Sequence, residues 1–329
     1  MVAVLFSGSH QIFGQPEFGM EYISELQLGR KDRIDLLQYL YLSLNVPISD
    51  ALSFRIATIT DAETRKTPVL DDYMVYSNVA AGNRILTLAV ANLQWAINDH
   101  HSIYLGIRNT NEDYFTSEGT AFFANSSCGI YPTISCNYDI ANFPFASPGV
   151  HYLYSSDSFE LKSTLYNGLG HRHFAGRDNV FRFCPKSDGV FLIGQGEYKH
   201  SGSIYSLGAC MHYGIAEQTS TKKDRTTLWT HVEHALSPNL CLIGGYSHSL
   251  ANDAFCKDFG GLGFIRSFSK TKLGIYSCIS GFAGSNEYAT EVSYNIALNR
   301  YCYLQPTVHY IKNSISDGLV GVLRFGIEI

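Results

Sequence analysis

Acidic and basic side chains recur at every second position in segments whose other positions are apolar. In an extended strand, residues i and i+2 share one face, so these charges fall on the polar face. Acids and bases on one face can hold solutes by charge-assisted hydrogen bonds, and an acidic surplus repels anions. The acids are Glu21, Glu25, Asp35, Glu160, Glu197, Glu233, Glu291 and Glu328, and the bases are Arg55, Arg108, Lys162 and Arg324.

Histidines on the polar face raise the question of a metal site. His151, His212 and His231 fall there, and His231 points the same way as Glu233, whereas His234 points to the other face. Two ligands are too few for zinc, which takes three or four, and the spacing is not H-E-x-x-H. The sequence therefore predicts no metal and no cofactor. No nucleophile–base arrangement has the specificity that would indicate an enzyme.

Tyrosines divide between the two faces. Those on the apolar face stand near expected strand ends, which is typical of an interfacial girdle: Tyr22, Tyr152, Tyr198, Tyr246, Tyr294 and Tyr310. Those on the polar face can stack on a sugar or a guanidinium, or they can simply fill space, and both interpretations stay open. They are Tyr39, Tyr41, Tyr104, Tyr166 and Tyr276.

The alternation that carries these residues runs along the whole chain and predicts about sixteen strands. The last one, Gly318–Ile329, places Leu319 and Leu323 on one side and Arg324 and Glu328 on the other. An apolar terminal strand invites aggregation in a soluble protein but suits a closed transmembrane barrel. The others are expected at Met20–Leu28, Ile34–Val46, Ala51–Thr60, Arg84–Ile97, Ser102–Thr110, Pro148–Tyr154, Phe159–Asn167, Asp188–Tyr198, Ser203–Ile215, Thr226–Leu236, Leu240–His248, Phe259–Arg266, Lys272–Ser280, Tyr288–Leu298 and Tyr301–Lys312.

The connections alternate between short turns and mostly longer loops, which is the signature of an all-β, antiparallel outer-membrane barrel. A soluble sandwich is the structural alternative, but it does not explain this alternation. Both termini then lie on the short-turn, periplasmic side. The longest loop, Asn111–Ser147, is expected to fold inward as a constriction. Its candidate residues are Asp113, Tyr114, Phe115 and Asn125.

Composition agrees with a membrane barrel. Charged residues make up only 16% of the 329 residues, Tyr (22) and Phe (20) are frequent, and the net charge of −5 argues against a nucleic-acid partner. No run of 18 apolar residues could form a helical span. We expect an N-terminal periplasmic segment over residues 1–19 and the barrel over residues 20–329. Because the start lacks a basic n-region, either a leader has been removed or N-terminal sequence is missing.

Eight cysteines are unusual for such a barrel. No C-x-x-C occurs, so zinc-ribbon and thioredoxin motifs are not expected. The cysteines are either small apolar wall residues or cross-links formed in an oxidising envelope. Those expected in loops, and so best placed to pair, are Cys128, Cys136, Cys184 and Cys256.

An ordered series of segments resembles the carbohydrate-selective (OprB-like) outer-membrane porin family. The matches are collinear from Ser77 to the C-terminus: Ser77–Val79 leading into Arg84–Trp95, Tyr104–Arg108 with Asp113–Phe115, Phe122–Ser127, Ser147–Val150, Leu165–Gly168, Asp188–Leu192, Glu291–Tyr294, and Leu304–Tyr310 with Asn313. The resemblance implies a passive channel in the bacterial outer membrane for small hydrophilic solutes.

Two departures bear on the cargo. Where the family places basic residues, this chain has His151 and Leu153, and glycines stand in place of an arginine in Leu240–His248. A branch of the family that also has cysteines serves arginine uptake, so the resemblance makes a basic amino acid a rival to sugar. We therefore expect cationic or neutral cargo such as L-arginine. The pore-lining candidates are Arg55, Tyr104, Arg108, His151, Glu197, His212, Glu233, Glu291 and Arg324.

Three functional hypotheses remain from the sequence. The first is a charge-selective porin for arginine-like cargo, and the second is a sugar porin. The third is a non-transporting surface barrel such as an adhesin, which would carry its information in long outer loops. The expected partners are small hydrophilic solutes and outer-membrane lipid, and the barrel could form a homo-oligomer.

Overall fold

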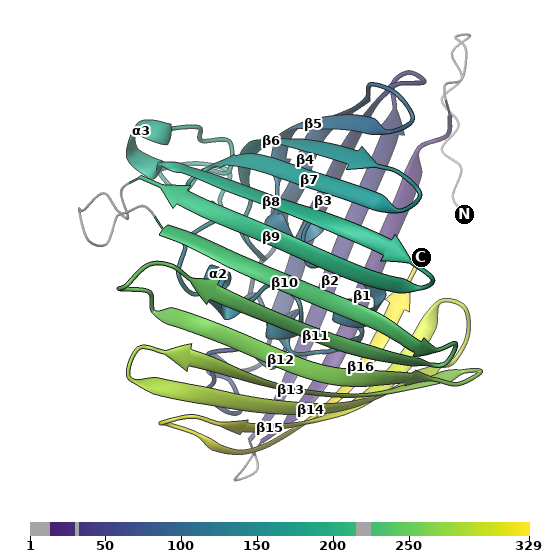
Figure 1. Ribbon diagram of the computed structural model, residues 1–329, viewed down its shortest axis with the longest axis vertical. Coiled ribbons are helices and arrows are strands. Elements are labelled where there is room, and N and C mark those ends of the chain that lie inside the picture. The colour runs from purple at the N-terminus through teal and green to yellow at the C-terminus, as the bar shows by residue number, and fades with distance from the viewer. Residues whose placement is uncertain (1–13, 30–32, 215–224) are drawn as a thin grey trace.

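The computed structural model describes residues 14–29, 33–214 and 225–329. Residues 1–13, and the part of the expected Ala216–Arg225 loop that precedes Arg225, lie outside the described residues. Within the described part of the chain, sixteen strands form one closed antiparallel barrel (Figure 1). No helix in that part is long and apolar enough to cross a bilayer.

The sixteen strands confirm the predicted series, with ends shifted by a few residues. Their bounds are β1 Glu17–Leu28, β2 Ile34–Pro47, β3 Leu52–Glu63, β4 Thr87–Ala96, β5 His101–Arg108, β6 Ser147–Ser155, β7 Phe159–Asn167, β8 Val190–His200, β9 Ser203–Tyr213, β10 Arg225–Ser237, β11 Leu240–Ser249, β12 Cys256–Ser267, β13 Thr271–Phe282, β14 Ser285–Ala297, β15 Cys302–Lys312 and β16 Asp317–Glu328. Strand β1 starts three residues before the expected boundary at residue 20.

Strands β1 and β16 close the barrel. They pair antiparallel, with Glu21 opposite Glu328 and Leu28 opposite Gly321. The first and last strands therefore pair with each other, which confirms the prediction made from the apolar terminal strand. In β16, Leu319 and Leu323 are exposed, whereas the alternate residues up to Arg324 are buried.

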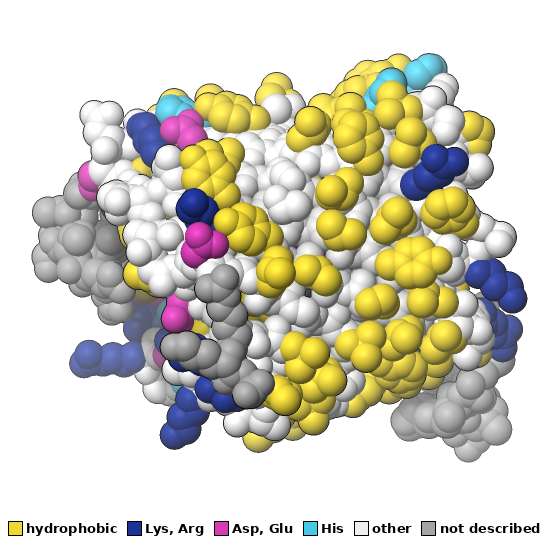
Figure 2. All heavy atoms as spheres, turned by 90° about the horizontal axis from the view of Figure 1, so that it is seen from below, with side chains coloured by type: hydrophobic (Ala, Val, Ile, Leu, Met, Phe, Trp, Pro, Cys, Tyr) yellow, Lys and Arg dark blue, Asp and Glu magenta, His cyan; other side chains and the backbone are white. Residues whose placement is uncertain are grey.

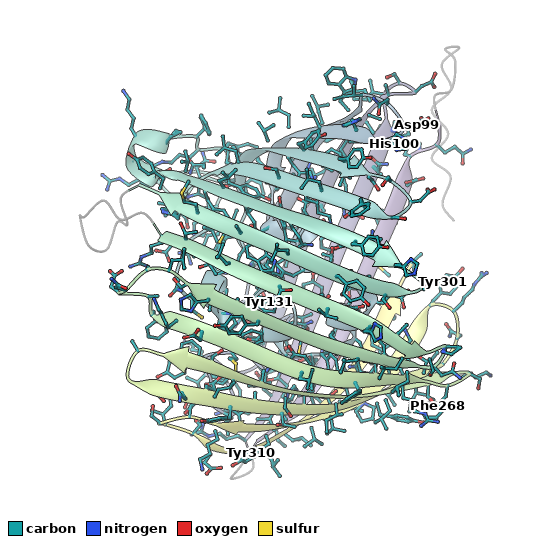
Figure 3. All side chains as sticks on the ribbon, viewed as in Figure 1. Asp99, His100, Tyr131, Phe268, Tyr301 and Tyr310 are labelled. Carbon is teal, nitrogen blue, oxygen red and sulfur yellow. The ribbon has the colours of Figure 1, made fainter. Side chains whose placement is uncertain are left out.

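The outer surface carries an apolar band. Figure 2 shows hydrophobic side chains over the middle of one face, with Lys and Arg mainly toward its two ends. Such a band with few charges is what a lipid environment requires of a barrel wall. Residues Asp99, His100, Phe268 and Tyr301 lie at the short-turn end, while Tyr310 lies toward the opposite end (Figure 3).

One strand boundary was wrong for a clear physical reason. Strand β4 begins at Thr87 rather than Arg84, because the Asp61 carboxylate on β3 accepts the backbone N–H groups of Ala81, Asn83 and Arg84 at 2.6–3.1 Å. These bonds hold Arg84 in a loop conformation, so it cannot join the sheet ladder.

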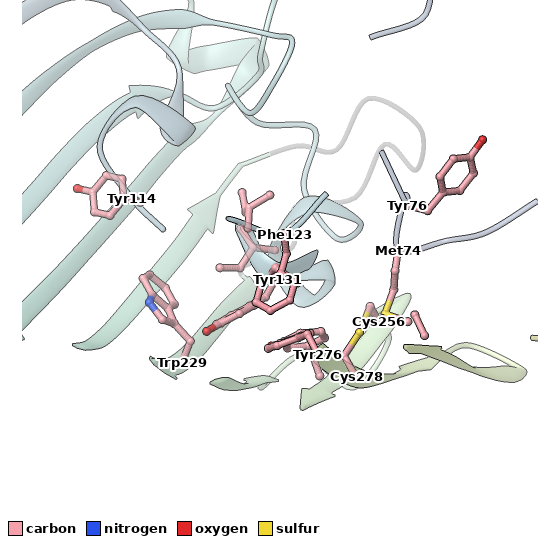
Figure 4. Close-up of a cluster of buried hydrophobic side chains, with 14 of the residues drawn as sticks. Met74, Tyr76, Tyr114, Phe123, Tyr131, Trp229, Cys256, Tyr276 and Cys278 are labelled. Atoms are coloured by element: carbon pink, nitrogen blue, oxygen red, sulfur yellow. Dashed lines mark hydrogen bonds between the residues drawn. The ribbon is translucent and has the colours of Figure 1, made fainter. Parts of the chain in front are cut away.

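Two long loops occupy the inside of the barrel. Residues 109–146 contain the 3₁₀ helices η1 Thr110–Glu112 and η2 Ser126–Cys128 and the short helices α1 Glu118–Phe122 and α2 Pro132–Ser135. Residues 64–86 form the second loop. A further helix, α3 Pro185–Asp188, belongs to the loop between β7 and β8. Rings of loop 109–146 pack with inward wall residues such as Trp229 and Tyr276 in one buried cluster (Figure 4).

Candidate solute pathway

The polar face predicted from the alternation is the inner face of the barrel. Most of the predicted charges are buried or half-buried there, while their apolar strand neighbours are exposed. The exception is Glu328, which is exposed at the rim. Some of these charges border cavities, and others bond groups of the chain itself.

Arg55 ties the start of loop 109–146 to the wall. Its Nη2 atom lies 3.1 Å from Glu112 Oε2 and donates to the Tyr41 hydroxyl at 3.0 Å. That hydroxyl donates in turn to Glu112 Oε1 at 2.8 Å. Because Tyr41 and Arg55 stand on adjacent strands, the three side chains form one bridge from β2 and β3 to η1.

A second, more buried ion pair joins Arg108, at the end of β5, to Asp113, which follows η1. Arg108 Nε donates to Asp113 Oδ2 at 2.8 Å, and its Nη2 bonds the other carboxylate oxygen. The Arg108 guanidinium lies 4.7 Å from the Tyr104 ring centroid, and the His151 ring stacks on Tyr104 at 5.1 Å. His151 Nδ1 also lies 2.6 Å from the Thr164 hydroxyl. The Tyr104 ring is thus already packed on two protein groups.

Arg324 serves the other inward loop. Its Nε donates to Glu25 Oε1 at 2.7 Å, and its Nη2 donates to Asn78 Oδ1 at 2.7 Å. The second oxygen of Glu25 accepts from Gln27 and from the Ser77 hydroxyl, each at 2.8 Å. Both charges are therefore used to hold loop 64–86 against the barrel seam.

Glu291 differs most from the sequence-based expectation. It was predicted as a solute contact, but its two oxygens accept the backbone N–H groups of Ala124 and Asn125 at 2.8 and 2.9 Å. The side chain is 2% exposed. Glu287 on β14 plays the same part for loop 64–86, accepting the N–H groups of Tyr73 and Met74 at 2.8 Å. Both carboxylates are loop anchors.

Glu233 and Glu197 are also engaged by the chain. Glu233 Oε1 accepts a short hydrogen bond from Ser117 and lies 3.2 Å from His231 Nε2. Glu197 accepts from Gln195 and Ser206 and lies 3.2 Å from Lys199 Nζ. Within the described residues, no three or more His, Cys, Asp or Glu side chains are grouped so that they could hold a metal ion.

The remaining predicted residues have mixed surroundings. His212 Nε2 donates to Gly168 O at 2.9 Å. In the loop, the Tyr114 hydroxyl bonds Thr164 and Ile193 O, and the Asn125 side chain accepts from Ser127 N to cap η2. Phe115 packs on Tyr131 and Trp229 with centroids 5.3 and 5.2 Å apart. Tyr114 and Asn125 are thus buried in the fold of the loop, whereas Phe115 also borders a cavity.

Glycines in β11 and β13 make room for this loop. A Cβ atom on Gly245 would lie 2.0 Å from the Tyr131 hydroxyl, and one on Gly274 would lie 2.3 Å from the Phe122 ring. Tyr131 itself stacks on Phe259 at 4.7 Å. Gly245, one of the two glycines in the expected strand Leu240–His248, therefore accommodates a loop side chain.

Three of the cavities in the described part of the chain border loop 109–146, with volumes of about 480, 910 and 880 Å³. We call them cavities A, B and C. Cavity A lies beside Tyr104, Arg55 and Asp113, B beside Tyr303 and Arg324, and C beside Lys199 and Glu118. In the described residues, the carboxylates lining them are Glu17, Glu21, Glu112, Asp113, Glu118, Asp157, Glu233 and Glu328, and the bases are Arg55, Arg108, Lys199, Lys272 and Arg324.

No protein-family model matches the sequence, and no curated protein matches it. Among solved structures, the barrel is similar to the high-pH structure of OprB from Pseudomonas putida, with a TM-score of 0.78 over 95% of this chain and 94% of that chain at 12% identity. This chain has the outer-membrane porin fold. A variant of a Rhodopseudomonas blastica porin is similar over 96% of this chain and 100% of that chain, with a TM-score of 0.56 at 11% identity.

Several functional positions of this porin barrel escaped the sequence interpretation. Glu287 was missed because the expected strand began at Tyr288, three residues after the start of β14, and Lys199 was missed because it was assigned to a turn. Glu112 was treated as part of a loop with no pattern. Extending the alternation by one or two residues at each strand end would have found Glu287 and Lys199, whereas no sequence signal marks Glu112.

Proposed function

We propose that this porin barrel lets small hydrophilic solutes diffuse passively across the outer membrane and favours cationic or neutral solutes over anions. The observation that supports this proposal is the lining of the three cavities, which has eight carboxylates and five Lys or Arg side chains among the described residues. A surplus of acid in a narrow, low-dielectric passage raises the local concentration of cations. The lining candidates named from the sequence remain part of this proposal, with Glu291 assigned to loop anchoring.

L-Arginine is the cargo we place first. Its guanidinium can donate two parallel N–H···O hydrogen bonds to a carboxylate, and Glu21 and Glu328 supply such acceptors at the barrel seam. These residues are directly opposite each other on β1 and β16, and both border cavity B. Glu118 lines both cavity B and cavity C. Several separated acids allow a cation to bind weakly and move on, as conduction requires.

A sugar porin is the second candidate, and cavity B supplies its support. Neutral polar groups of the two loops border this cavity, including Ser77, Asn78, Asn111, Thr116 and Asn142. Hydroxyl and amide groups suit the hydrogen-bonding needs of a sugar without requiring charge. The similarity to the OprB fold is equally compatible with this cargo.

Uptake by liposomes that contain the purified chain separates the two candidates. The arginine proposal predicts that Glu21→Gln combined with Glu328→Gln slows arginine uptake several-fold and leaves glucose uptake nearly unchanged. Asp99→Asn, at an exposed short turn, is the matched control and should change neither. Equal slowing of both solutes, or no change in arginine uptake, would count against arginine preference and favour the sugar porin.

Two further expectations belong to the same proposal. The part of the expected N-terminal segment that precedes β1 would lie in the periplasm, and the barrel would assemble with copies of itself. An adhesin remains the alternative from a different functional class. Stepwise conductance in a planar bilayer would exclude a barrel that does not transport.

A further inference from the structure

Two cysteines of loop 109–146 lie beside cysteines of the wall. Cys136 follows α2, and Cys256 begins β12, which corrects the expectation that Cys256 lies in a loop. All eight cysteines are unpaired thiols in this structure. Their surroundings nevertheless differ, and one pair stands out.

Hydrogen bonds fix the backbone next to Cys136 against Cys256. The Asn137 side chain donates from Nδ2 to Cys256 O at 2.7 Å, and its Oδ1 accepts from Cys256 N at 2.9 Å. Asn137 is buried, so both bonds are shielded from water. Residue 136 is therefore held beside residue 256 by a paired contact rather than by chance proximity.

Tyr73 contacts Cys136 and also the residues next to Cys256. Cys136 Sγ lies 3.9 Å from Tyr73 O, and the Tyr73 ring packs on Phe255 and Phe282 with centroids 6.0 and 4.8 Å apart. Phe255 precedes Cys256, and Phe282 is its partner across the β12–β13 ladder. Cys136 packs against the buried cluster that contains Cys256.

We propose that Cys136 and Cys256 form a disulfide that links loop 109–146 covalently to strand β12. Cys136 borders cavity B, so a small oxidant can reach it from the lumen, whereas Cys256 is fully buried. Cys136 is the attacking thiol, and Cys256 resolves the intermediate. The co-reactant is a disulfide oxidant, such as the periplasm supplies.

The reaction balances as a thiol–disulfide exchange. The Cys136 thiolate attacks one sulfur of the oxidant disulfide, forming a mixed disulfide and releasing one thiol. The Cys256 thiolate then attacks Cys136 Sγ and releases the second thiol. Two cysteine thiols lose two protons and two electrons in total, and the oxidant gains both to become two thiols.

The surroundings of Cys136 set the pH dependence of this exchange. Burial raises the pKa of Cys136 to about 11, and Glu287 and Asp72 oppose its ionisation further, while a bond from Ser135 acts the other way. The thiolate is the nucleophile, so the cross-linking rate should rise about tenfold per pH unit from pH 7 until the pKa is approached. The exchange is therefore slow at neutral pH in the folded barrel.

Cys128 and Cys278 form the competing pair. Cys278 Sγ lies 3.8 Å from Met74 Sδ, and Ser127 next to Cys128 donates to Met74 O at 3.0 Å (Figure 4). Both cysteines are nearly inaccessible, at 2% and 7% exposure. Burial raises the pKa of Cys128 well above its usual value. With no route for an oxidant, we expect this pair to stay reduced.

Peptide mapping of the folded full-length chain tests the proposal. The detergent-solubilised barrel is treated with oxidised glutathione at pH 9, alkylated, and digested with trypsin without reduction. The expected product joins residues 109–162 to residues 226–257, with two fewer alkylated thiols than the reduced chain. Cys136→Ser and Cys256→Ser should each abolish this product, whereas Cys128→Ser and Cys241→Ser should retain it. A difference in gel mobility between unheated and heated samples confirms that each variant is folded.

Three results would overturn the assignment. One is a link that survives Cys136→Ser or Cys256→Ser, and another is a link to residues 273–300, which contain Cys278. The third is absence of any link in a folded barrel after prolonged treatment at pH 9. Because the readout is a cross-link and not transport, the outcome is independent of the proposed cargo.

Discussion

Single residues in this lumen mostly hold the two inward loops in place. Glu25, Glu287 and Glu291 all give their carboxylate oxygens to loop groups. The alternation in the sequence predicts that Glu25 and Glu291 face inward, because the face of a strand residue is set by its parity. It could not predict their partners, because the path of the loops leaves no periodic signal.

The Arg108–Asp113 pair allows a quantitative prediction at this scale. Arg108→Met or Asp113→Asn leaves one buried charge without its partner, so each should lower the free energy of unfolding by about 3–5 kcal/mol. The double variant should lose less than the sum of the two. Urea unfolding of the detergent-solubilised barrel measures these values.

Arg300→Met is the matched control for that experiment. Arg300 lies in an exposed short turn and packs only on the Tyr301 ring in the contacts described. Its replacement should change stability by less than about 1 kcal/mol. If Arg108→Met lowered the free energy of unfolding no more than Arg300→Met does, the buried pair would not stabilise the barrel.

At the scale of elements, loop 109–146 depends on a few wall carboxylates and on glycines that leave it room. Glu291→Ala removes the acceptor of two backbone N–H groups, so the amides of Ala124 and Asn125 should exchange with deuterium at least about tenfold faster. Hydrogen-exchange mass spectrometry over residues 123–127 measures this. Glu328→Ala, at the exposed rim, is the control and should leave those amides protected. Equal protection in both variants would contradict the role of Glu291 as an anchor of loop 109–146.

A glycine substitution probes the same loop from the wall. Gly245→Val places carbon where the Tyr131 hydroxyl lies, and such overpacking should cost about 1–3 kcal/mol of stability. Phe115 packs on both Tyr131 and Trp229, so displacement of the loop should shift the emission of Trp229 to longer wavelength. A Trp95→Phe background isolates that signal.

Gly196→Val serves as the control, since a Cβ atom there would meet nothing within 4 Å. It should leave both the emission of Trp229 and the urea midpoint unchanged. An unshifted emission in the Gly245→Val variant would show that the loop does not need the space that Gly245 leaves.

The strands of the barrel could be predicted from the sequence better than the residues that are available to a solute. All sixteen strands follow from period-two alternation, and the longest loop follows from its length. The tyrosines show the limit: Tyr41, Tyr104 and Tyr276 face inward as predicted, yet they pack on or bond protein groups. Whether an inward ring is left free for a solute depends on the fold of loop 109–146, and only the three-dimensional packing shows that.

At the scale of the whole molecule, an apolar outer band and a charged interior divide the chain between two environments. Leucines of the wall such as Leu262 and Leu319 point outward. Charged side chains lie on the inner face or toward the ends of the barrel. The acidic surplus in the cavities is the property that should decide which ions pass, because fixed charge in a narrow passage acts on every solute that enters it.

The reversal potential of the unmodified chain measures the charge preference of the pore. The purified barrel is inserted in a planar bilayer with a tenfold gradient of potassium chloride, and the voltage of zero current is measured. We expect stepwise conductance and a reversal potential whose sign shows that potassium passes more readily than chloride. Absence of conductance steps, or a reversal potential of the anion-selective sign, would contradict this expectation.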